Sequence, residues 1–356
     1  MTRKIVVFAD GLFKKENYDN PKIQEIFKNV EKYDAKVEVV EDDTLTNFLK
    51  EGEPFSKAMI AVEKNGPEYF EQTQRVIDSV KDAEIALFHF NPCSTKQIAA
   101  GNNLKLVGSL RSGAENINVN ACKEKGIHVC TTPGRVSEAV ADYTVGMMLA
   151  LNRDIPMRNM SLPDVDWVNT EVLLADKGIL MKDATIGIVG FGIIGKKVTR
   201  RIQAFGSKVI AYDPYCSEEV AKEYGAELVE LNTLMKESDF VCVHARLLES
   251  TKGIIGKEQI ALMKNSAYFI NTARAGLVDE TALTEALVNN KIRGAALDVF
   301  ADEPLPKDSK LLQAKRVILT PHCAGAAGDG TVTSIEIMFD EVERYLKGEK
   351  LLNELK

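Results

Sequence analysis

Residues 184–198 read Ala-Thr-Ile-Gly-Ile-Val-Gly-Phe-Gly-Ile-Ile-Gly-Lys-Lys-Val, and a second apolar run begins at Val209 and ends at Asp213. This order predicts a strand, a glycine-rich turn, a helix and a second strand. The start of such a helix attracts the pyrophosphate of a dinucleotide, because its N–H groups are free and carry a partial positive charge. We therefore expect a dinucleotide-binding domain built around this stretch.

The three glycines of the turn are expected to have different roles. Gly190 permits the tight turn, Gly192 lets the backbone approach a pyrophosphate, and Gly195 lets the helix pack closely on the sheet. Asp213 can accept hydrogen bonds from both hydroxyl groups of the adenine ribose and would repel a 2′-phosphate, which favours NAD over NADP. Three glycines alone could mark only a sharp strand-to-helix turn, but an acid about 20 residues downstream completes the dinucleotide signature.

The composition excludes several classes of function. The chain has 356 residues, enough for two domains, and a net charge of −7 without a basic cluster, so we expect neither nucleic acid nor an anionic membrane as a partner. No apolar run is long enough for a signal peptide or a membrane-spanning helix, and a cytoplasmic protein fits best. The six cysteines show no metal-type pairing, so we expect reduced thiols and no metal site.

Short apolar runs alternate with stretches of helical spacing along the chain. This alternation predicts an α/β fold with two doubly wound parallel sheets whose faces are covered by helices. Before the glycine turn, the expected strands cover residues 4–10, 36–42, 84–90, 105–110 and 127–131. After the turn they cover residues 208–212, 227–229, 239–243, 267–271, 294–298 and 316–319, which we interpret as a six-strand domain.

Two predicted helices indicate how the domains are connected. A strongly apolar helix over residues 137–151, with Ser137 as its N-cap, suits a domain junction. The last helix, residues 331–346, lies beyond the final strand of the nucleotide domain, and we expect it to cross back onto the first domain. The only tryptophan, Trp167, is expected to anchor a loop or an interface without a role in chemistry.

These helices predict a discontinuous first domain. We expect a Rossmann NAD-binding domain, residues 113–325, inserted in a flavodoxin-like substrate domain formed by residues 1–112 and 326–356. The cleft between two such domains is the natural place for a small substrate.

The candidate proton donor is one of four histidines, because imidazole exchanges a proton near neutral pH. His322 comes directly after the final strand and precedes small residues that would let a ligand approach, so we predict that His322 is the donor. His244, at the end of another strand, is expected to line the cofactor. His89 stays open as a substrate-binding residue, and His128 is expected to be a core or edge residue of a strand.

Carboxylates and an arginine also lie where strands are expected to end. Asp298 and Glu303 follow one strand, and either could stabilise the charged form of His322. Arg274 follows another strand and could hold the carboxylate and carbonyl oxygens of a 2-oxo acid with its planar guanidinium group. Because the carboxyl ends of parallel strands face the ligand crevice, these residues predict a site for a 2-hydroxy or 2-oxo acid.

Four motifs carry a resemblance to a known family: Gly190-Phe-Gly-Ile-Ile-Gly, Asn271-Thr-Ala-Arg-Ala-Gly, Leu297-Asp-Val-Phe-Ala-Asp-Glu-Pro and Thr320-Pro-His. From about Lys105 to His322, the chain resembles the D-isomer-specific 2-hydroxyacid dehydrogenases. The resemblance implies hydride transfer between NAD and C2 of a D-2-hydroxy acid. It also implies that members are usually dimers joined through the nucleotide domain.

The resemblance further implies roles for individual residues. Arg274 would bind the substrate and polarise its carbonyl, Glu303 would pair with His322, and His322 would exchange the proton. Backbone N–H groups of Ser112 and Gly113 would hold the substrate carboxylate. Beside Gly190, Gly192, Gly195 and His244, the implied cofactor-binding residues are Ile193, Ile194, Asp213, Thr272, Ala273, Arg274, Asp298, His322 and Gly325.

The sequence departs from the family pattern at several places. Arg246 stands where the family usually has proline after His-x, which puts a charge by the adenine side and weakens the case against NADP. Arg111 stands where glycine is common and adds a cation to the substrate pocket. Phosphoglycerate-specific relatives usually have arginines in the segment that matches residues 88–94, whereas this chain has none there. Arg111 could compensate for their absence. Formate dehydrogenases of the superfamily pair the histidine with glutamine. Because this chain has Glu303 at that place, the sequence argues against a formate dehydrogenase.

Two function classes remain open at this stage. The first is an NAD-dependent oxidoreductase acting on a small hydroxy or oxo acid. The second is an NAD(H)-sensing binding protein of the same fold, as some corepressor relatives are. The retained Arg274, Glu303 and His322 favour the enzyme. Its substrate stays open among glyoxylate, hydroxypyruvate, a branched-chain 2-oxo acid, and 3-phosphoglycerate or another phosphorylated sugar acid.

Overall fold

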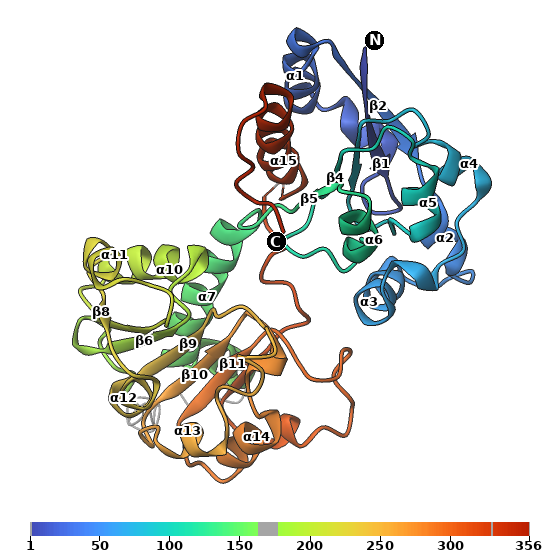
Figure 1. Ribbon diagram of the computed structural model, residues 1–356. Helices are drawn as coiled ribbons and strands as arrows, with labels where there is room; N and C mark the ends of the chain where they lie inside the picture. Colours follow the sequence, from blue (N-terminus) through green and yellow to red (C-terminus); the bar gives the residue numbers. More distant parts are fainter. Residues whose placement is uncertain (1, 163–176, 329, 356) are drawn as a thin grey trace. The chain divides into compact units, whose positions relative to one another are not determined.

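The computed structural model describes residues 2–162, 177–328 and 330–355, so Trp167 lies outside the described residues (Figure 1). The chain forms two compact units. The first unit combines Met1–Arg135 with Asp329–Lys356, and the second unit is Val136–Gly328. Each unit contains its own parallel sheet, so the α/β class with two parallel sheets is confirmed.

The sheet of the first unit has the strand order β2-β1-β3-β4-β5, and all of its neighbouring strands run parallel. Its strands are β1 (Arg3–Ala9), β2 (Ala35–Glu41), β3 (Ile85–Phe88), β4 (Leu106–Ser109) and β5 (His128–Cys130). Its α-helices are α1 (Pro21–Asn29), α2 (Thr44–Phe48), α3 (Phe55–Asn65), α4 (Gln74–Asp78), α5 (Thr95–Ala100), α6 (Val119–Glu124) and α15 (Gly330–Lys347).

Alternating side chains of β1 form two separate cores, one on each face of this sheet. Ile5 and Val7 belong to the core that includes Met338 of α15. Val6 and Phe8 belong to the opposite core, which takes in side chains from α4, α5 and α6. The expected return of the last helix to the first unit is therefore confirmed, and Figure 1 shows α15 beside α1.

The units divide at residues 135/136 and 328/329, whereas the sequence placed the domain boundaries at 112/113 and 325/326. The reason lies in β5, which pairs with β4 from His128 to Cys130. The chain therefore completes the first sheet before it enters the second unit.

The sheet of the second unit has the strand order β12-β11-β10-β9-β6-β7-β8. Its strands are β6 (Thr185–Val189), β7 (Lys208–Tyr212), β8 (Glu227–Leu228), β9 (Phe240–Val243), β10 (Tyr268–Asn271), β11 (Gly294–Leu297) and β12 (Val317–Leu319). Seven strands are thus present in the described part of this unit, and the prediction of a six-strand domain was wrong. The strand before the glycine turn, β6, joins the six that follow it and lies between β9 and β7.

The α-helices described in the second unit are α7 (Ser137–Asn152), α8 (Ile155–Ser161), α10 (Ile193–Gln203), α11 (Glu218–Glu223), α12 (Leu231–Glu237), α13 (Lys257–Ala261) and α14 (Glu280–Val288). The predicted N-cap of α7 was wrong. Ser137 is already the first helical residue, and the capping position is Val136, which makes no side-chain capping hydrogen bond. Within residues 2–162, 177–328 and 330–355, no helix is both long and apolar enough to cross a membrane.

Candidate active site

The three glycines of the turn between β6 and α10 meet different surroundings. Gly190 has a φ of +94°, which favours glycine, and a Cβ there would lie 2.4 Å from the backbone nitrogen of Ala245. A Cβ on Gly195 would lie 2.4 Å from the carbonyl oxygen of Gly190, because α10 packs closely against the turn. A Cβ on Gly192 would meet no atom within 4 Å. The space beside Gly192 is therefore open to a ligand.

Asp213 follows β7 and lies against this turn. Its carboxylate accepts hydrogen bonds from the backbone N–H of Phe191 at 2.8 Å and of Tyr215 at 2.9 Å, one on each oxygen. A carboxylate oxygen has two lone pairs, so each oxygen keeps the capacity to accept a further hydrogen bond. The arrangement suits the two hydroxyl groups of a ribose.

His244 follows β9 and lies beside the turn, since a Cβ on Gly190 would lie 2.7 Å from its carbonyl carbon. The residue is half-buried, and both of its ring nitrogens are buried. Burial lowers the pKa of His244 to about 4, so the ring is neutral at pH 7. Neither ring nitrogen has a hydrogen-bond partner among the residues that the structure describes. Because a buried polar group without a partner is unfavourable, a polar ligand would satisfy this ring. Gly192, Asp213 and His244 therefore fit a dinucleotide.

The glycine environments predict opposite effects of two matched substitutions. We expect Gly192→Ala to leave the thermal unfolding midpoint unchanged, because the added methyl group enters open space, and to weaken NADH binding by about tenfold or more. Gly195→Ala should instead lower stability by about 1–3 kcal/mol, because the methyl group would overlap a backbone oxygen. Thermal unfolding and NADH titration of both variants measure this difference. Equal NADH affinity in Gly192→Ala and the wild type would contradict the assignment.

The side chains of His322 and Glu303 form a hydrogen bond at the carboxyl ends of neighbouring strands. His322 follows β12, Glu303 follows β11, and the ring Nδ1 lies 2.9 Å from the Glu303 Oε2. The His322 side chain is 41% exposed, so a ligand can reach the ring. Because Nδ1 is engaged by the carboxylate, Nε2 is the nitrogen left to exchange a proton. The residue has a φ of +51°, an uncommon conformation for a side-chain-bearing residue that occurs often at functional sites.

Asp298 is fully buried and supports the loop that carries His322. Its carboxylate accepts hydrogen bonds from the Thr320 hydroxyl at 2.6 Å, the Cys323 N–H at 3.0 Å and the Ala324 N–H at 2.8 Å. The sequence left both acids open as the partner of His322, and the structure pairs Glu303 with the ring. Asp298 instead ties the ends of the loop together.

Tyr143 of α7 also reaches this loop, and the sequence contained no signal for it. Its hydroxyl lies 3.2 Å from the Cys323 sulfur. Burial, and after it the hydrogen bond with Cys323, raises the pKa of Tyr143. At the next residue of α7, the Thr144 hydroxyl lies 2.8 Å from that of Thr272. The helix thus supports two of the loops that carry candidate site residues.

Arg274 comes after β10, which pairs with β11, the strand that precedes Glu303; β12, which precedes His322, lies on the other side of β11. The side chain of Asn271 accepts a hydrogen bond from the Ala273 N–H at 3.0 Å and donates one to the Arg274 carbonyl at 3.1 Å, which fixes the loop. The Arg274 side chain is exposed and donates through Nη1 to the Ala273 carbonyl at 2.8 Å. Its other N–H groups are therefore available to a planar acid.

The remaining cofactor candidates lie at the start of α10 and after His322. Ile193 is the first residue of α10 and is 48% exposed, while Ile194 is half-buried. Gly325 is half-buried, and a Cβ there would lie 3.4 Å from the Val136 side chain, which is ordinary contact. The space around Gly325 is thus less restricted than that around Gly190.

The substrate candidates of the first unit lie in the loop after β4. The Ser109 hydroxyl donates to the Gly113 carbonyl at 2.8 Å, and that of Ser112 donates to the Thr132 carbonyl at 3.4 Å. Arg111 is buried, stacks on the Phe90 ring and forms an ion pair with Glu63. Glu63 therefore offsets part of the positive charge that Arg111 adds to this loop.

The other two histidines make structural contacts in the first unit. His89 follows β3, is buried, and has its Nδ1 3.1 Å from a carboxylate oxygen of Asp10. His128 is exposed on β5, an edge strand, with its Nδ1 2.6 Å from Glu354. The edge position expected for His128 is confirmed.

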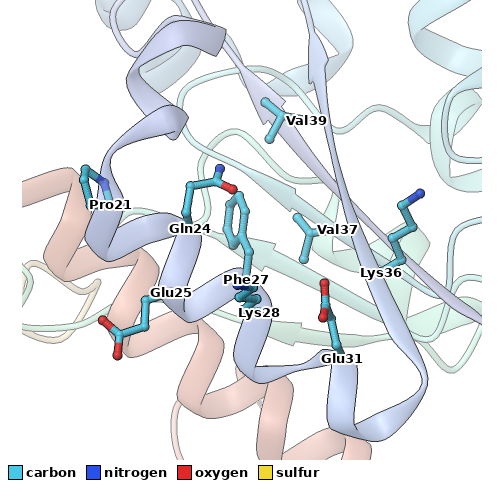
Figure 2. A pocket seen from close by; sticks show the side chains of 9 residues that line it. All are labelled: Pro21, Gln24, Glu25, Phe27, Lys28, Glu31, Lys36, Val37 and Val39. Carbon is cyan, nitrogen blue, oxygen red and sulfur yellow. The ribbon is translucent and has the colours of Figure 1, made fainter.

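A surface groove with a volume of about 570 Å³ lies at α1 and β2 in the first unit. Figure 2 shows the side chains that line it. The groove is lined by Pro21, Gln24, Glu25, Phe27, Lys28, Glu31, Lys36, Val37 and Val39. Acidic and basic side chains line it together, and no candidate site residue is among them. We therefore place the candidate active site elsewhere, at the carboxyl ends of the strands.

Comparison with known proteins agrees with this geometry. Residues 145–324 match the family described as D-isomer specific 2-hydroxyacid dehydrogenase, NAD binding domain. A D-3-phosphoglycerate dehydrogenase of Methanocaldococcus jannaschii is 41% identical over 278 residues, which make up 78% of this chain and 52% of that protein. The chain therefore spans about half the length of that relative.

Two further proteins are similar over most of their length. A hydroxypyruvate reductase of Thermotoga maritima is 41% identical over 252 residues, which cover 69% of this chain and 80% of that protein. The crystal structure of a D-lactate dehydrogenase with NAD+ from Lactobacillus jensenii has a TM-score of 0.74 and 27% identity, with 99% of each chain covered. The similarity thus includes both units.

Proposed function

The chain belongs to the D-isomer-specific 2-hydroxyacid dehydrogenase family, and from this premise we propose that it is an NAD-dependent oxidoreductase. It interconverts a D-2-hydroxy acid and the corresponding 2-oxo acid. The observation that carries the proposal is the hydrogen bond between His322 and Glu303, 2.9 Å long, at the carboxyl ends of β12 and β11. A proton donor held in this way is what reduction of a carbonyl group requires.

Each residue of the proposed site has a defined task. NAD, when bound, supplies or accepts the hydride. His322 gives a proton to the carbonyl oxygen during reduction and takes it from the hydroxyl group during oxidation. Glu303 orients the ring through Nδ1 and stabilises its charged form. Arg274 binds the acid and polarises its carbonyl group through its planar guanidinium.

The cofactor site is proposed at the glycine turn. Its backbone at Gly192 borders open space, and Asp213 has lone pairs free to accept the ribose hydroxyl groups. These features favour NAD over NADP. The further contacts proposed for the cofactor are those of Gly190, Ile193, Ile194, Gly195, His244, Thr272, Ala273, Arg274, Asp298, His322 and Gly325.

The first unit is proposed to bind the substrate. The backbone N–H groups of Ser112 and Gly113 would hold its carboxylate, and Arg111 adds positive charge to the same loop. We further propose a cytoplasmic homodimer joined through the NAD-binding unit. Size-exclusion chromatography with light scattering tests this assembly, and a monomer at the enzyme's working concentration would contradict it.

A phosphorylated substrate such as 3-phosphoglycerate is kept as a second candidate. It is favoured by the M. jannaschii relative, which is named for phosphoglycerate, and by the buried cation Arg111. A silent NAD(H)-sensing protein is less favoured, because the exposed His322 ring and its carboxylate partner serve proton transfer.

The experiment that tests the proposal is the oxidation of NADH in the presence of a panel of 2-oxo acids, phosphorylated ones included. We expect turnover with one group of acids and a smaller kcat/KM with NADPH than with NADH. If the protein binds NADH but reduces no acid of the panel, the sensing role gains support and the enzyme assignment is contradicted.

A further inference from the structure

Arg111 and Arg135 of the first unit are joined by one loop, and among the described residues a single carboxylate, that of Glu63, forms an ion pair with either of them. The backbone of one loop joins them, since the Thr132 N–H donates to the Arg111 carbonyl at 2.8 Å and the Arg135 N–H donates to the Thr132 carbonyl at 3.4 Å. Arg111 follows β4, and Arg135 follows β5, the neighbouring strand. Both side chains therefore start from the carboxyl edge of the first sheet.

Arg111 is only partly satisfied by its surroundings. Its guanidinium lies 4.4 Å from the centre of the Phe90 ring, and its Nη2 forms an ion pair with Glu63 of α3. Its Nη1 is buried and has no hydrogen-bond partner among the described residues, although the side chain is only 9% exposed. A buried guanidinium nitrogen without an acceptor is unfavourable, so this nitrogen is suited to an additional anion.

The positive charge of Arg135 is balanced even less than that of Arg111. Its Nη1 donates to the Ser334 hydroxyl at 3.5 Å, and in the described part of the chain no carboxylate forms an ion pair with it. Burial, and after it the charge of Arg111, lowers the pKa of Arg135 to about 10. The two cations thus repel each other in a partly buried place, and an anion between them would relieve the repulsion.

Thr132 adds a polar atom at the same place. Its side chain is fully buried, and its hydroxyl has no hydrogen-bond partner among the residues that the structure describes. Thr132 also lies between the two arginines in the hydrogen-bonded loop. Three donors on two neighbouring strand ends therefore lack acceptors or charge balance.

We propose that Arg111, Thr132 and Arg135 form a subsite for a second acidic group of the substrate, a carboxylate or a phosphate. The inference rests on the proposed function, since Arg111 directly precedes the Ser112 and Gly113 N–H groups proposed to hold the 2-oxo acid. An acid held there would present a second acidic group, a few bonds away, to the two guanidinium groups. The enzyme would then prefer doubly acidic substrates.

The experiment compares kcat/KM for two sets of probes with the full-length enzyme. Pyruvate and 2-oxobutyrate carry one acidic group, oxaloacetate and 2-oxoglutarate carry a second carboxylate, and phosphohydroxypyruvate carries a phosphate. We expect the wild type to prefer one doubly acidic class, which identifies the second group as carboxylate or phosphate. Arg135→Gln should lower that preference by about tenfold or more, because a charge-assisted hydrogen bond is lost.

Two further variants test whether a change in substrate preference comes from the subsite itself. Arg344→Gln removes the same charge from the same unit, about 15 Å along α15 from Ser334, and should leave the preference unchanged. Thr132→Val keeps the side-chain volume and removes only the unpartnered hydroxyl, so it should lower the preference in the same direction even if Arg135→Gln fails to fold. Wild-type turnover of singly acidic probes alone, or an equal preference in Arg135→Gln and Arg344→Gln, would overturn the subsite and leave the proposed function intact.

A binding measurement separates this inference from failure of the proposed function. If no acid is reduced, the proposed function is contradicted, and a thermal-shift titration with inorganic phosphate and with succinate then decides the anion site. Stabilisation of the wild type and of Arg344→Gln by either anion, lost in Thr132→Val and Arg135→Gln, supports the site. Absence of stabilisation, or equal stabilisation of all four proteins, overturns it.

Discussion

His322→Ala is expected to lower kcat by about 100- to 10,000-fold, the range over which a positioned acid or base accelerates proton transfer. The expected loss is large because the ring is the proposed proton donor, and its Nδ1 lies 2.9 Å from the Glu303 carboxylate. NADH affinity should change much less, since the glycine turn and Asp213 lie on other strands. Steady-state kinetics and an NADH titration of the same preparation measure both quantities. Unchanged turnover would remove His322 from the mechanism.

Glu303→Gln and Asp298→Asn provide the comparison for this variant. Glu303→Gln keeps the shape of the side chain but removes the charge that stabilises the imidazolium, so we expect a smaller loss of kcat and an altered pH profile. Asp298→Asn should act differently, because Asp298 accepts four hydrogen bonds from the loop, one of them from the Cys323 thiol, and none that the structure describes from the ring. We expect Asp298→Asn to lower the thermal unfolding midpoint, which Glu303→Gln should leave nearly unchanged.

The features that the sequence predicts well are those with a local cause. The strand, glycine turn and helix around residues 184–198 follow from an apolar run and three glycines, and β6 and α10 form there. The apolar face of the last helix also predicted its burial, since Ile335, Met338 and Val342 lie in the first core. In both cases the residues that carry the sequence pattern belong to the same short segment as the element that they predict.

The features that the sequence could not resolve depend on residues far apart in the chain. Asp298 and Glu303 both follow β11, and only the folded loop shows that one supports the backbone while the other contacts the ring. Tyr143 reaches Cys323 across 180 positions of sequence, and no local pattern marks such a contact. The loop from Arg111 to Arg135 is a further example, because the charge imbalance arises only when β4 and β5 pair.

Arg274→Lys is the second substitution with a large expected effect. A lysine ammonium is a point charge, whereas the arginine guanidinium presents parallel N–H groups to two oxygens in one plane. The Arg274 side chain is exposed and only Nη1 is engaged, by the Ala273 carbonyl, so the group is free to bind a planar acid. We expect kcat/KM for the 2-oxo acid to fall by about 100- to 1,000-fold, as on removal of a donor that stabilises developing charge.

The cause of that loss can be tested with a second variant and an added cation. Arg274→Ala should lose at least as much activity as Arg274→Lys, and guanidinium ion added to the assay should restore part of it to Arg274→Ala but not to Arg274→Lys. The lysine side chain would occupy the place that the free guanidinium needs. Full activity of Arg274→Lys would mean that charge alone holds the acid, and the planar grip proposed for Arg274 would have to be given up.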